Sequence, residues 1–399
     1  MLTPRGRLAL VFGAGVYLAA WAFGSEPLYP VAVGFLLAVL LAAVIVHVTA
    51  RPMRYHRFGA AREHVEGDDV AVDVELQPDV PLRLAGVTVV ERIAKLGEQR
   101  IGLVRHGRIL RGRLALDRLP RGRYALDEAF AVVEDPFGFE RAVVPLPAQH
   151  ALLVLPRLVD IETPFSQSGA RAHDGKRLLM RRPSGFDVHS VREYEEGESL
   201  RKVHWKTTAR RGRLMVKELQ DEPRDEVAVI LDAAAGTPTP AFDAAVRAAG
   251  SLLKAQVWHD RRAVLVITSL RAEVLRVQSY AGDWRNALES LAAAEATGTL
   301  PLAAALAEDG GAASRAHELS IVTTRLEPGL VDRLVHRALA QRKVSLVFVD
   351  APTFEGRPPS REPGLLRLQS AGVPVAVLRV GDDLAEVLSA TPAVEAVHG

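Results

Sequence analysis

A charged segment near the middle of the chain, residues 171–226, carries the side chains best suited to chemistry. A cationic surface with an aromatic side chain can bind a phosphate, a membrane headgroup or an acidic partner. Carboxylates flank it closely, so a second interpretation also stays open, in which arginine–carboxylate pairs lock neighbouring elements together. The basic and aromatic residues are Arg201, Lys202, Trp205, Lys206, Arg210 and Arg211, and the acids are Glu193, Glu195, Glu196, Glu198, Glu218, Asp221 and Glu222.

Other kinds of chemistry find little support in the sequence. The chain has no cysteine, which excludes disulfides, thiolate metal sites and cysteine nucleophiles. His189, Glu193 and His204 suggest a metal site, but they lack the ligand spacing of known zinc sites. There is no phosphate-binding loop, dinucleotide glycine fingerprint or nucleophile-elbow serine. We therefore expect a non-enzymatic protein without a cofactor.

Local signals indicate which elements position the charged side chains. Residues 184–199 begin with the alternation of a strand, and Ser199 is a suitable N-cap for a helix from Leu200 to about Arg210. Gly212 lies just past that helix as a stop signal. Residues 213–219 alternate again. We predict a strand, a helix and a second strand within a connecting segment, residues 159–225.

The composition excludes several functional classes. Lys and Arg number 50 against 48 Asp and Glu, a formal net charge of +2, which disfavours nucleic acid as a partner. Hydrophobic residues at 48% and charged ones at 25% are typical of globular domains, and 399 residues allow two or three of them. The mean hydropathy of +0.09 is high for so charged a chain. An apolar segment must therefore be concentrated somewhere.

Residues 8–50 are that segment, since they contain no Lys or Arg. A turn-forming group at residues 24–27 divides them into candidate spans 8–23 and 29–48, within a predicted transmembrane hairpin, residues 1–56. The basic flanks predict a multi-pass cell-membrane protein with both termini in the cytoplasm. The alternative is a cleaved signal peptide that ends near Ala20-Trp21-Ala22. The flanking arginines are Arg5, Arg7, Arg51, Arg54 and Arg57.

Two folded domains are predicted beyond the hairpin. Residues 57–158 show the two-residue period of short strands, as in 70–76 and 87–90, with Gly and Pro between them, which indicates an antiparallel β-sandwich. Residues 226–399 alternate apolar strands with helices, which indicates a doubly wound α/β domain with a parallel sheet. The predicted fold class is therefore a membrane-anchored combination of an all-β and an α/β domain. Ligands of such sheets bind at the carboxyl ends of the strands, where Asp232 follows the first one.

The charged segment resembles the signature of the bacterial family called domain of unknown function 58. The hairpin and three other motifs fall in the order that the family shows, so the resemblance spans essentially the whole chain. Glu198 and His204 depart from the pattern, since the family usually has Asp at both places. The matching residues are Arg192, Glu193, Tyr194, Gly197, Glu198, Arg201, Trp205, Lys206, Ala209 and Arg210, with Val191 and residues 214–218; the other motifs are residues 121–124, 135–138 and 155–156.

The resemblance implies that the α/β domain is similar to von Willebrand factor A domains, whose metal site uses Asp-x-Ser-x-Ser after the first strand. In this chain Ala234 and Gly236 stand where that motif has hydroxyls, and a later strand ends in Thr323-Thr324-Arg325 instead of an Asp. Mg²⁺ prefers six oxygen ligands, so Asp232 alone would hold it only weakly. We predict no functional metal, with Asp232 as a helix cap or turn former.

The resulting functional expectation is a membrane-tethered cytoplasmic scaffold or interaction protein. The family resemblance implies a partner of the MoxR-type AAA+ ATPase class and a role in the assembly of envelope complexes. Two alternatives remain open: a hydrolase or transferase that acts on a phosphorylated envelope precursor through Asp187, Glu193 or Asp232, and a sensor of anionic lipids. The sequence does not indicate an oligomeric state. The expected critical cluster is Arg192, Arg201, Trp205 and Arg210.

Overall fold

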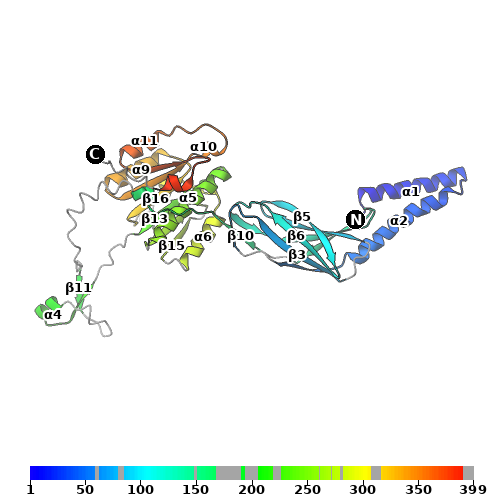
Figure 1. Cartoon of the computed structure of the whole chain (residues 1–399), viewed down its shortest axis with the longest axis horizontal. Helices are drawn as coiled ribbons and strands as arrows, with labels where there is room; N and C mark the ends of the chain where they lie inside the picture. The colour runs from blue at the N-terminus through cyan, green and yellow to red at the C-terminus, as the bar shows by residue number, and fades with distance from the viewer. Residues whose placement is uncertain are drawn as a thin grey trace, which may run out of the picture. The chain divides into compact units, whose positions relative to one another are not determined.

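The chain divides into two compact units, residues 1–157 and 158–399, in a computed structural model (Figure 1). The structure describes residues 1–58, 63–79, 85–147, 151–167, 190–193, 205–218, 226–259, 261–270, 272–278, 282–306 and 316–389.

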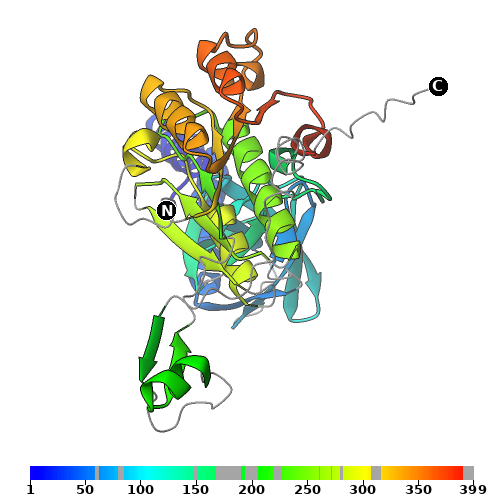
Figure 2. The same ribbon diagram turned by 90° about the vertical axis from the view of Figure 1, so that its left-hand side faces the viewer.

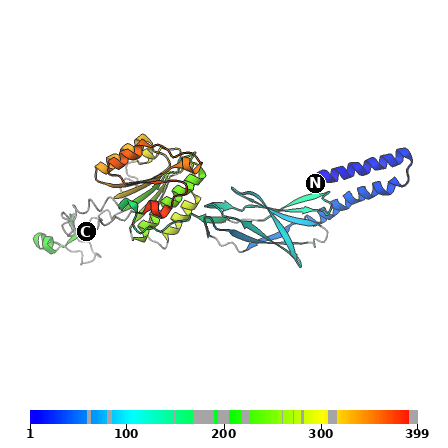
Figure 3. The same cartoon turned by 45° about the horizontal axis from the view of Figure 1, so that its top comes forward.

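The first unit begins with two antiparallel apolar helices that lie side by side, α1 (Pro4–Phe23) and α2 (Leu28–Thr49) (Figure 3). Both are long and apolar enough to cross a membrane, by length and composition. Gly13 of α1 lies in the contact between the two helices. Its lack of a side chain allows them to pack closely, since a Cβ there would lie 3.1 Å from Phe35 Cβ. Gly24 ends α1 with a left-handed φ of 63°. The predicted spans 8–23 and 29–48 lie inside these helices.

Within the described residues of the first unit, ten strands follow the helices and form two sheets. A seven-stranded antiparallel sheet has the order β1-β3-β6-β5-β4-β8-β9, and a three-stranded sheet has the order β2-β10-β7. One hydrophobic cluster contains side chains from both sheets, among them Val72 and Leu152. The strands are β1 (Met53–Phe58), β2 (Glu63–Val65), β3 (Val70–Pro78), β4 (Gly86–Ile93), β5 (Gly97–His106), β6 (Ile109–Leu116), β7 (Gly122–Ala125), β8 (Glu128–Glu134), β9 (Arg141–Leu146) and β10 (Ala151–Leu155).

A buried ion pair joins distant strands of the larger sheet. Arg57 of β1 donates to both carboxylate oxygens of Glu91 on β4, at 3.0 and 2.7 Å. Tyr55 also donates its hydroxyl to Glu91, which is fully buried. The two strands stand four places apart in the sheet, so the sheet curls to bring them together. Burial and the negative charge of Glu91 both raise the pKa of Tyr55, which stays a neutral donor.

The second unit contains a six-stranded sheet with the order β15-β14-β13-β16-β17-β18, in which only β15 runs antiparallel to its neighbour. Successive residues of β13 point to opposite faces: Val229 and Leu231 pack with α5, and Ala228 and Ile230 pack with α9. Figure 2 shows these helices on opposite faces of the sheet. The strands are β13 (Val227–Leu231), β14 (Ala263–Ile267), β15 (Glu273–Val277), β16 (Glu318–Thr323), β17 (Lys343–Val349) and β18 (Val375–Leu378).

The helices of this unit connect the strands. They are α5 (Thr239–Trp258), α6 (Asp283–Ala293), α7 (Leu302–Ala305), α9 (Pro328–Leu339), α10 (Ala351–Phe354), α11 (Pro363–Ser370) and α12 (Leu384–Leu388). A 3₁₀ turn, η1 (Phe165–Gln167), precedes the charged segment, whose described elements are β11 (Ser190–Glu193), α4 (Trp205–Arg211) and β12 (Met215–Glu218). The predicted alternation of strands and helices in residues 226–399 is present.

Candidate functional site

The charged segment folds around a two-stranded antiparallel pair. Arg192 of β11 lies opposite Val216 of β12, and Glu193 lies opposite Met215. Helix α4 is joined to β12 by a hydrogen bond of 3.0 Å from the Met215 amide to the Thr208 hydroxyl. The helix is followed by Gly212, whose φ of 70° is the left-handed conformation that glycine adopts without strain.

This pairing brings two parts of the predicted signature together at the level of the backbone. Strand β11 holds three of its residues, β12 holds four and α4 holds four, of which Ala209 and Arg210 are exposed. The predicted strand–helix–strand order is present, and the described helix begins at Trp205. Other predicted residues lie outside the described part of the chain: Asp187, His189, Tyr194, Gly197, Glu198, Ser199, Leu200, Arg201, Lys202 and His204.

A second cluster of polar side chains lies at the carboxyl end of the six-stranded sheet, around Asp232. This residue follows β13, is 4% exposed and accepts a hydrogen bond from the Thr323 hydroxyl at 2.6 Å. The Thr268 hydroxyl lies 3.3 Å from the other carboxylate oxygen. Thr268 follows β14 and Thr323 ends β16, the two neighbours of β13. Residues at the carboxyl ends of three adjacent strands are thus joined through the carboxylate of Asp232.

An arginine closes this cluster on its exposed side. Arg325 donates from Nη2 to the Ala235 carbonyl at 2.6 Å, and its positive charge partly offsets the rise in the pKa of Asp232 that burial causes. A Cβ on Gly236 would lie 3.4 Å from the same guanidinium nitrogen. The Thr237 and Thr324 hydroxyls lie 3.2 Å apart beside it. The exposed guanidinium therefore covers the loop that follows β13.

The loop before α7 contacts the loop that follows β13 through backbone hydrogen bonds. Gly298 forms a parallel bridge with Ala234, donates to the Ala233 carbonyl at 2.7 Å and accepts from the Ala235 amide at 2.8 Å. A Cβ on Gly298 would lie 2.1 Å from the Thr268 carbonyl oxygen. Only glycine allows the two backbones to approach so closely.

These bonds decide what Asp232 can do. Burial raises the pKa of its carboxyl above the ordinary value, although the bonds from Thr323, Thr268 and the Ala234 amide oppose this change. The expected role as a helix cap is wrong, because α5 begins only at Thr239 and Pro238 precedes it. The Ala234 amide bond is that of a turn former.

The donor set also does not fit Mg²⁺. Ala234 and Gly236 offer no side-chain oxygen, and both oxygens of Asp232 already accept hydrogen bonds. The guanidinium of Arg325 supplies positive charge near Asp232, at the place where a bound Mg²⁺ would otherwise supply it. Within the described residues, no group of three or more His, Cys, Asp and Glu side chains is placed to hold a metal ion.

The cluster occupies the topological switch point of the sheet. After β13 the chain goes to β14 and β15 on one side, and later to β16, β17 and β18 on the other. Ligands of open α/β sheets bind at such a place, outside the carboxyl ends of the strands. The sequence located Asp232 there but missed Thr268 and Arg325 as its neighbours. The available signal was that each residue closely follows an apolar strand.

Replacing Asp232 by Asn tests the described electrostatics. Because the carboxyl has a raised pKa in the folded chain, the folded state is favoured at low pH and loses stability as pH rises from about 4, the value of an unfolded Asp, through the raised pKa. The stability difference between wild type and Asp232→Asn should therefore change over that range. Urea unfolding followed by the fluorescence of buried Trp284 measures it. A difference that is constant between pH 4 and pH 8 would contradict the assignment.

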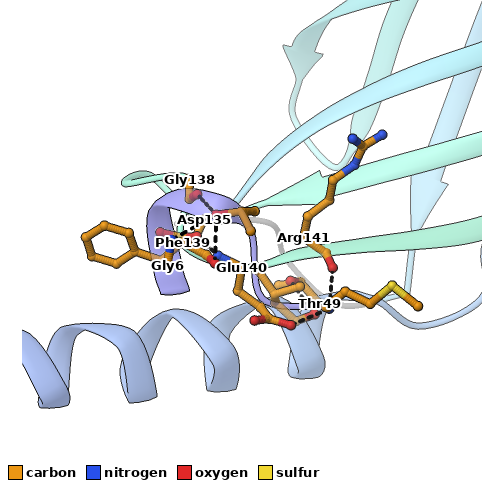
Figure 4. Close-up of polar contacts among 10 residues, drawn as sticks. Gly6, Thr49, Asp135, Gly138, Phe139, Glu140 and Arg141 are labelled. Carbon is orange, nitrogen blue, oxygen red and sulfur yellow. Dashed lines mark hydrogen bonds and ion pairs between the residues drawn. The ribbon is translucent and has the colours of Figure 1, made fainter. Parts of the chain in front are cut away.

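A third polar cluster joins α1 to the turn between β8 and β9 in the first unit (Figure 4). Thr3 caps α1, and its amide and hydroxyl donate to the carbonyls of Phe139, at 2.9 Å, and Gly138, at 2.5 Å. Asp135 shapes the turn by accepting from the amides of Phe137 and Glu140, at 2.8 and 2.6 Å. The turn of the sequence motif 135–138 is therefore a docking point for the first apolar helix.

Gly6 allows this docking, and its replacement should undo it. A Cβ on Gly6 would lie 2.2 Å from the Phe139 carbonyl oxygen, whereas a Cβ on Gly15 in the same helix meets nothing within 4 Å. Gly6→Ala should expose the amides of residues 1–10 and 134–142 to hydrogen exchange. Gly15→Ala should stabilise the helix by about 0.5–1 kcal/mol. Equal protection in both variants would contradict the docking.

Comparison with known proteins gives a family match for the region that contains the charged segment and the cluster around Asp232. Residues 190–350 match the family described as "Protein of unknown function DUF58". Residues 190–350 of the chain belong to the DUF58 family. The matched region begins at the first residue of β11 and ends directly after β17, so it contains the charged segment, Asp232 and Arg325. The apolar helices and the β domain lie outside the DUF58 match.

Other comparisons add no functional information to the DUF58 assignment. No curated protein matches the chain. Among solved structures, a cycloalternan-forming enzyme from Listeria monocytogenes is 13% identical over 26% of this chain and 9% of its own, with a TM-score of 0.18. The alkylpurine DNA glycosylase AlkC from Pseudomonas fluorescens is 13% identical over 33% and 42%, with a TM-score of 0.16.

A conjugative transposon lipoprotein from Bacteroides eggerthii is 11% identical over 25% of this chain and 96% of its own, with a TM-score of 0.15. The chain spans less than half of the length of the first two proteins. TM-scores this low carry no argument about fold or function.

Proposed function

We propose that this DUF58 protein is a membrane-tethered scaffold whose α/β domain binds a protein partner at the switch point of its sheet. The observation that carries the proposal is the cluster of Asp232, Thr323 and Arg325. An exposed guanidinium held in place at a ligand-binding edge suits recognition of a partner's carboxylate. Both oxygens of Asp232 are bonded to other groups, which disfavours the alternative of Asp232 as a catalytic acid or base.

We also propose the finer description of the two domains. The strand order of the six-stranded sheet and the place of Asp232 support a von Willebrand factor A-like domain that has lost its metal ligands. The core shared by the two β sheets supports a sandwich that acts as a stalk. The family resemblance supports a MoxR-type AAA+ ATPase as the partner in the assembly of an envelope complex.

The charged segment supplies a test of the partner surface that is independent of Asp232. Replacement of Arg201 and Arg210 together by Gln should reduce the protein that co-purifies with the full-length chain from membranes, as measured by quantitative mass spectrometry. If the co-purified proteins and the folding are both unchanged, the charged segment is not part of the interaction surface.

The proposed topology places both termini in the cytoplasm and the loop between α1 and α2 outside. The chain has no native cysteine, so single cysteines report without background. An impermeant thiol reagent added to intact cells should label Ser25→Cys and should leave Ser269→Cys unlabelled. Labelling of Ser269→Cys without labelling of Ser25→Cys would refute this topology.

A further inference from the structure

One end of the β domain lies beside the apolar helices. Strand β1 begins at Met53, four residues after α2 ends, and Met53 pairs with Pro78 of β3. In the neighbouring strand pairs, Leu76 of β3 lies opposite Leu110 of β6, and His106 of β5 lies opposite Ile109 of β6. The β5–β6 hairpin turn at Gly107 therefore lies at the same end of the sheet as α2, and Figure 1 shows this end beside the helices.

The β8–β9 turn lies at that end as well, because it contacts the first turn of α1. It presents an aromatic pair: Phe137, whose exposed fraction is 63%, stacks on Phe139 with 5.6 Å between the ring centroids. The carboxylate of Asp135 in the same turn is buried and bonded to backbone amides. The exposed part of the turn is therefore apolar.

Positive charge surrounds this aromatic tip. Among the described residues at this end, seven exposed arginines face three carboxylates, of which the Glu140 side chain is only 15% exposed. The opposite end of the sheet has exposed acids such as Asp69 and Asp117 beside the exposed Arg118. The arginines are Arg5, Arg7, Arg51, Arg54, Arg105, Arg108 and Arg141, and the carboxylates are Asp79, Glu134 and Glu140.

The place where the β8–β9 turn contacts α1 gives the depth of this surface relative to a bilayer. Thr3 bonds to the β8–β9 turn, and the apolar run begins at Leu8, five residues later in the helix. Five residues of helix span about 7–8 Å. This is about the thickness of one headgroup layer, since a bilayer is about 30 Å of hydrocarbon and 40–45 Å with its headgroups. Phe137 would therefore lie among the headgroups.

We propose that this end of the β domain, with Phe137 and the surrounding arginines, is a binding surface for the anionic headgroups of the membrane that α1 and α2 cross. An exposed apolar side chain such as Phe137 can enter the boundary between headgroups and acyl chains, and each nearby Arg adds attraction to anionic lipid. The contact adds to the docking of α1 on the β8–β9 turn in fixing the β domain against the bilayer. This inference rests on the proposed membrane insertion of the helices.

Quenching of site-specific fluorophores tests the proposal on the full-length chain in nanodiscs of phosphatidylcholine and phosphatidylglycerol. Phe137→Cys and, as a second site, His106→Cys carry an environment-sensitive label. Ala94→Cys is the matched control, because Ala94 is exposed in the β4–β5 turn at the opposite end of the sheet. Nitroxides on the lipid headgroups should quench the labels at Phe137 and His106 several-fold more strongly than the label at Ala94.

The charge dependence provides a second readout. Replacement of Arg105 and Arg108 by Glu, far from the label in sequence, should reduce the quenching at Phe137. Removal of phosphatidylglycerol or addition of salt should do the same, because salt screens the attraction. Quenching at Phe137 and His106 that equals the quenching at Ala94 would overturn the proposal.

A label at Leu40→Cys separates this failure from failure of the proposed topology. Leu40 lies in the middle of α2 and is 60% exposed. If nitroxides deep in the acyl chains quench the Leu40 label and the Phe137 label remains unquenched, α2 is inserted and only the headgroup surface is refuted. If the Leu40 label is also unquenched, the membrane insertion itself fails.

Discussion

Glu91→Ala should destabilise the β domain by about 3–5 kcal/mol, because it leaves the charge of Arg57 buried without its partner. The side chain of Arg57 is 7% exposed and bonds to both oxygens of Glu91. The substitution also removes the acceptor of the buried Tyr55 hydroxyl. Hydrogen exchange of peptides from β1, β4 and β8 in the full-length chain should accelerate by a factor between about 10² and 4 × 10³, at 1.4 kcal/mol for each factor of ten.

Glu98→Ala is the control for this prediction, because Glu98 pairs with Arg92 at 2.9 Å while both side chains are more than half exposed. Exposed pairs contribute about 0–1 kcal/mol. The control should therefore leave the exchange of the same peptides nearly unchanged. Equal effects of the two substitutions would show that the buried pair does not hold β1 to β4.

Gly298→Ala should destabilise the α/β domain by about 3 kcal/mol or more, at the upper end of the range for overpacked sites. The added methyl group would lie 2.1 Å from the Thr268 carbonyl oxygen and 2.9 Å from the Ala233 carbonyl oxygen. Neither backbone oxygen can rotate away as a side chain would. The loop must therefore detach from the strand end that carries Asp232.

Urea unfolding followed by Trp284 fluorescence measures this effect. Gly329→Ala is the control, because a Cβ at Gly329 in α9 would meet the nearest atom, Ala303 Cβ, at an ordinary 3.6 Å. Because Gly329 is the second residue of α9, that control should change the stability by less than about 0.5 kcal/mol. An unchanged unfolding midpoint for Gly298→Ala would contradict the close approach at the switch point.

The sequence predicted the alternation of strands and helices in residues 226–399, which includes the apolar runs of β13 (Val227–Leu231) and β17 (Lys343–Val349). The signal is strong there because a parallel sheet covered on both faces needs continuous apolar runs. It did not predict α11 (Pro363–Ser370), whose eight residues give too few turns for a clear helical period. The strand β1 begins at Met53, before the predicted domain start at residue 57.

The clusters of side chains were less predictable than the elements that hold them. Asp232 was located because it follows the first strand. Its bonds from Thr268 and Thr323 depend on which strands are neighbours, and local periodicity does not carry that information. The same reason applies to Glu91, whose partners stand on a strand four places away in the sheet.

The most direct test of the account is the effect of Arg325→Glu on the proteins that co-purify with the full-length chain from membranes. Arg276→Glu makes the same charge change on β15, opposite Val264 and away from the carboxyl ends of the strands. Quantitative mass spectrometry should show a partner that binds wild type and Arg276→Glu equally and loses about tenfold or more with Arg325→Glu. If a folded Arg325→Glu chain retains the same partners at the same amounts, the switch-point edge is not the binding surface.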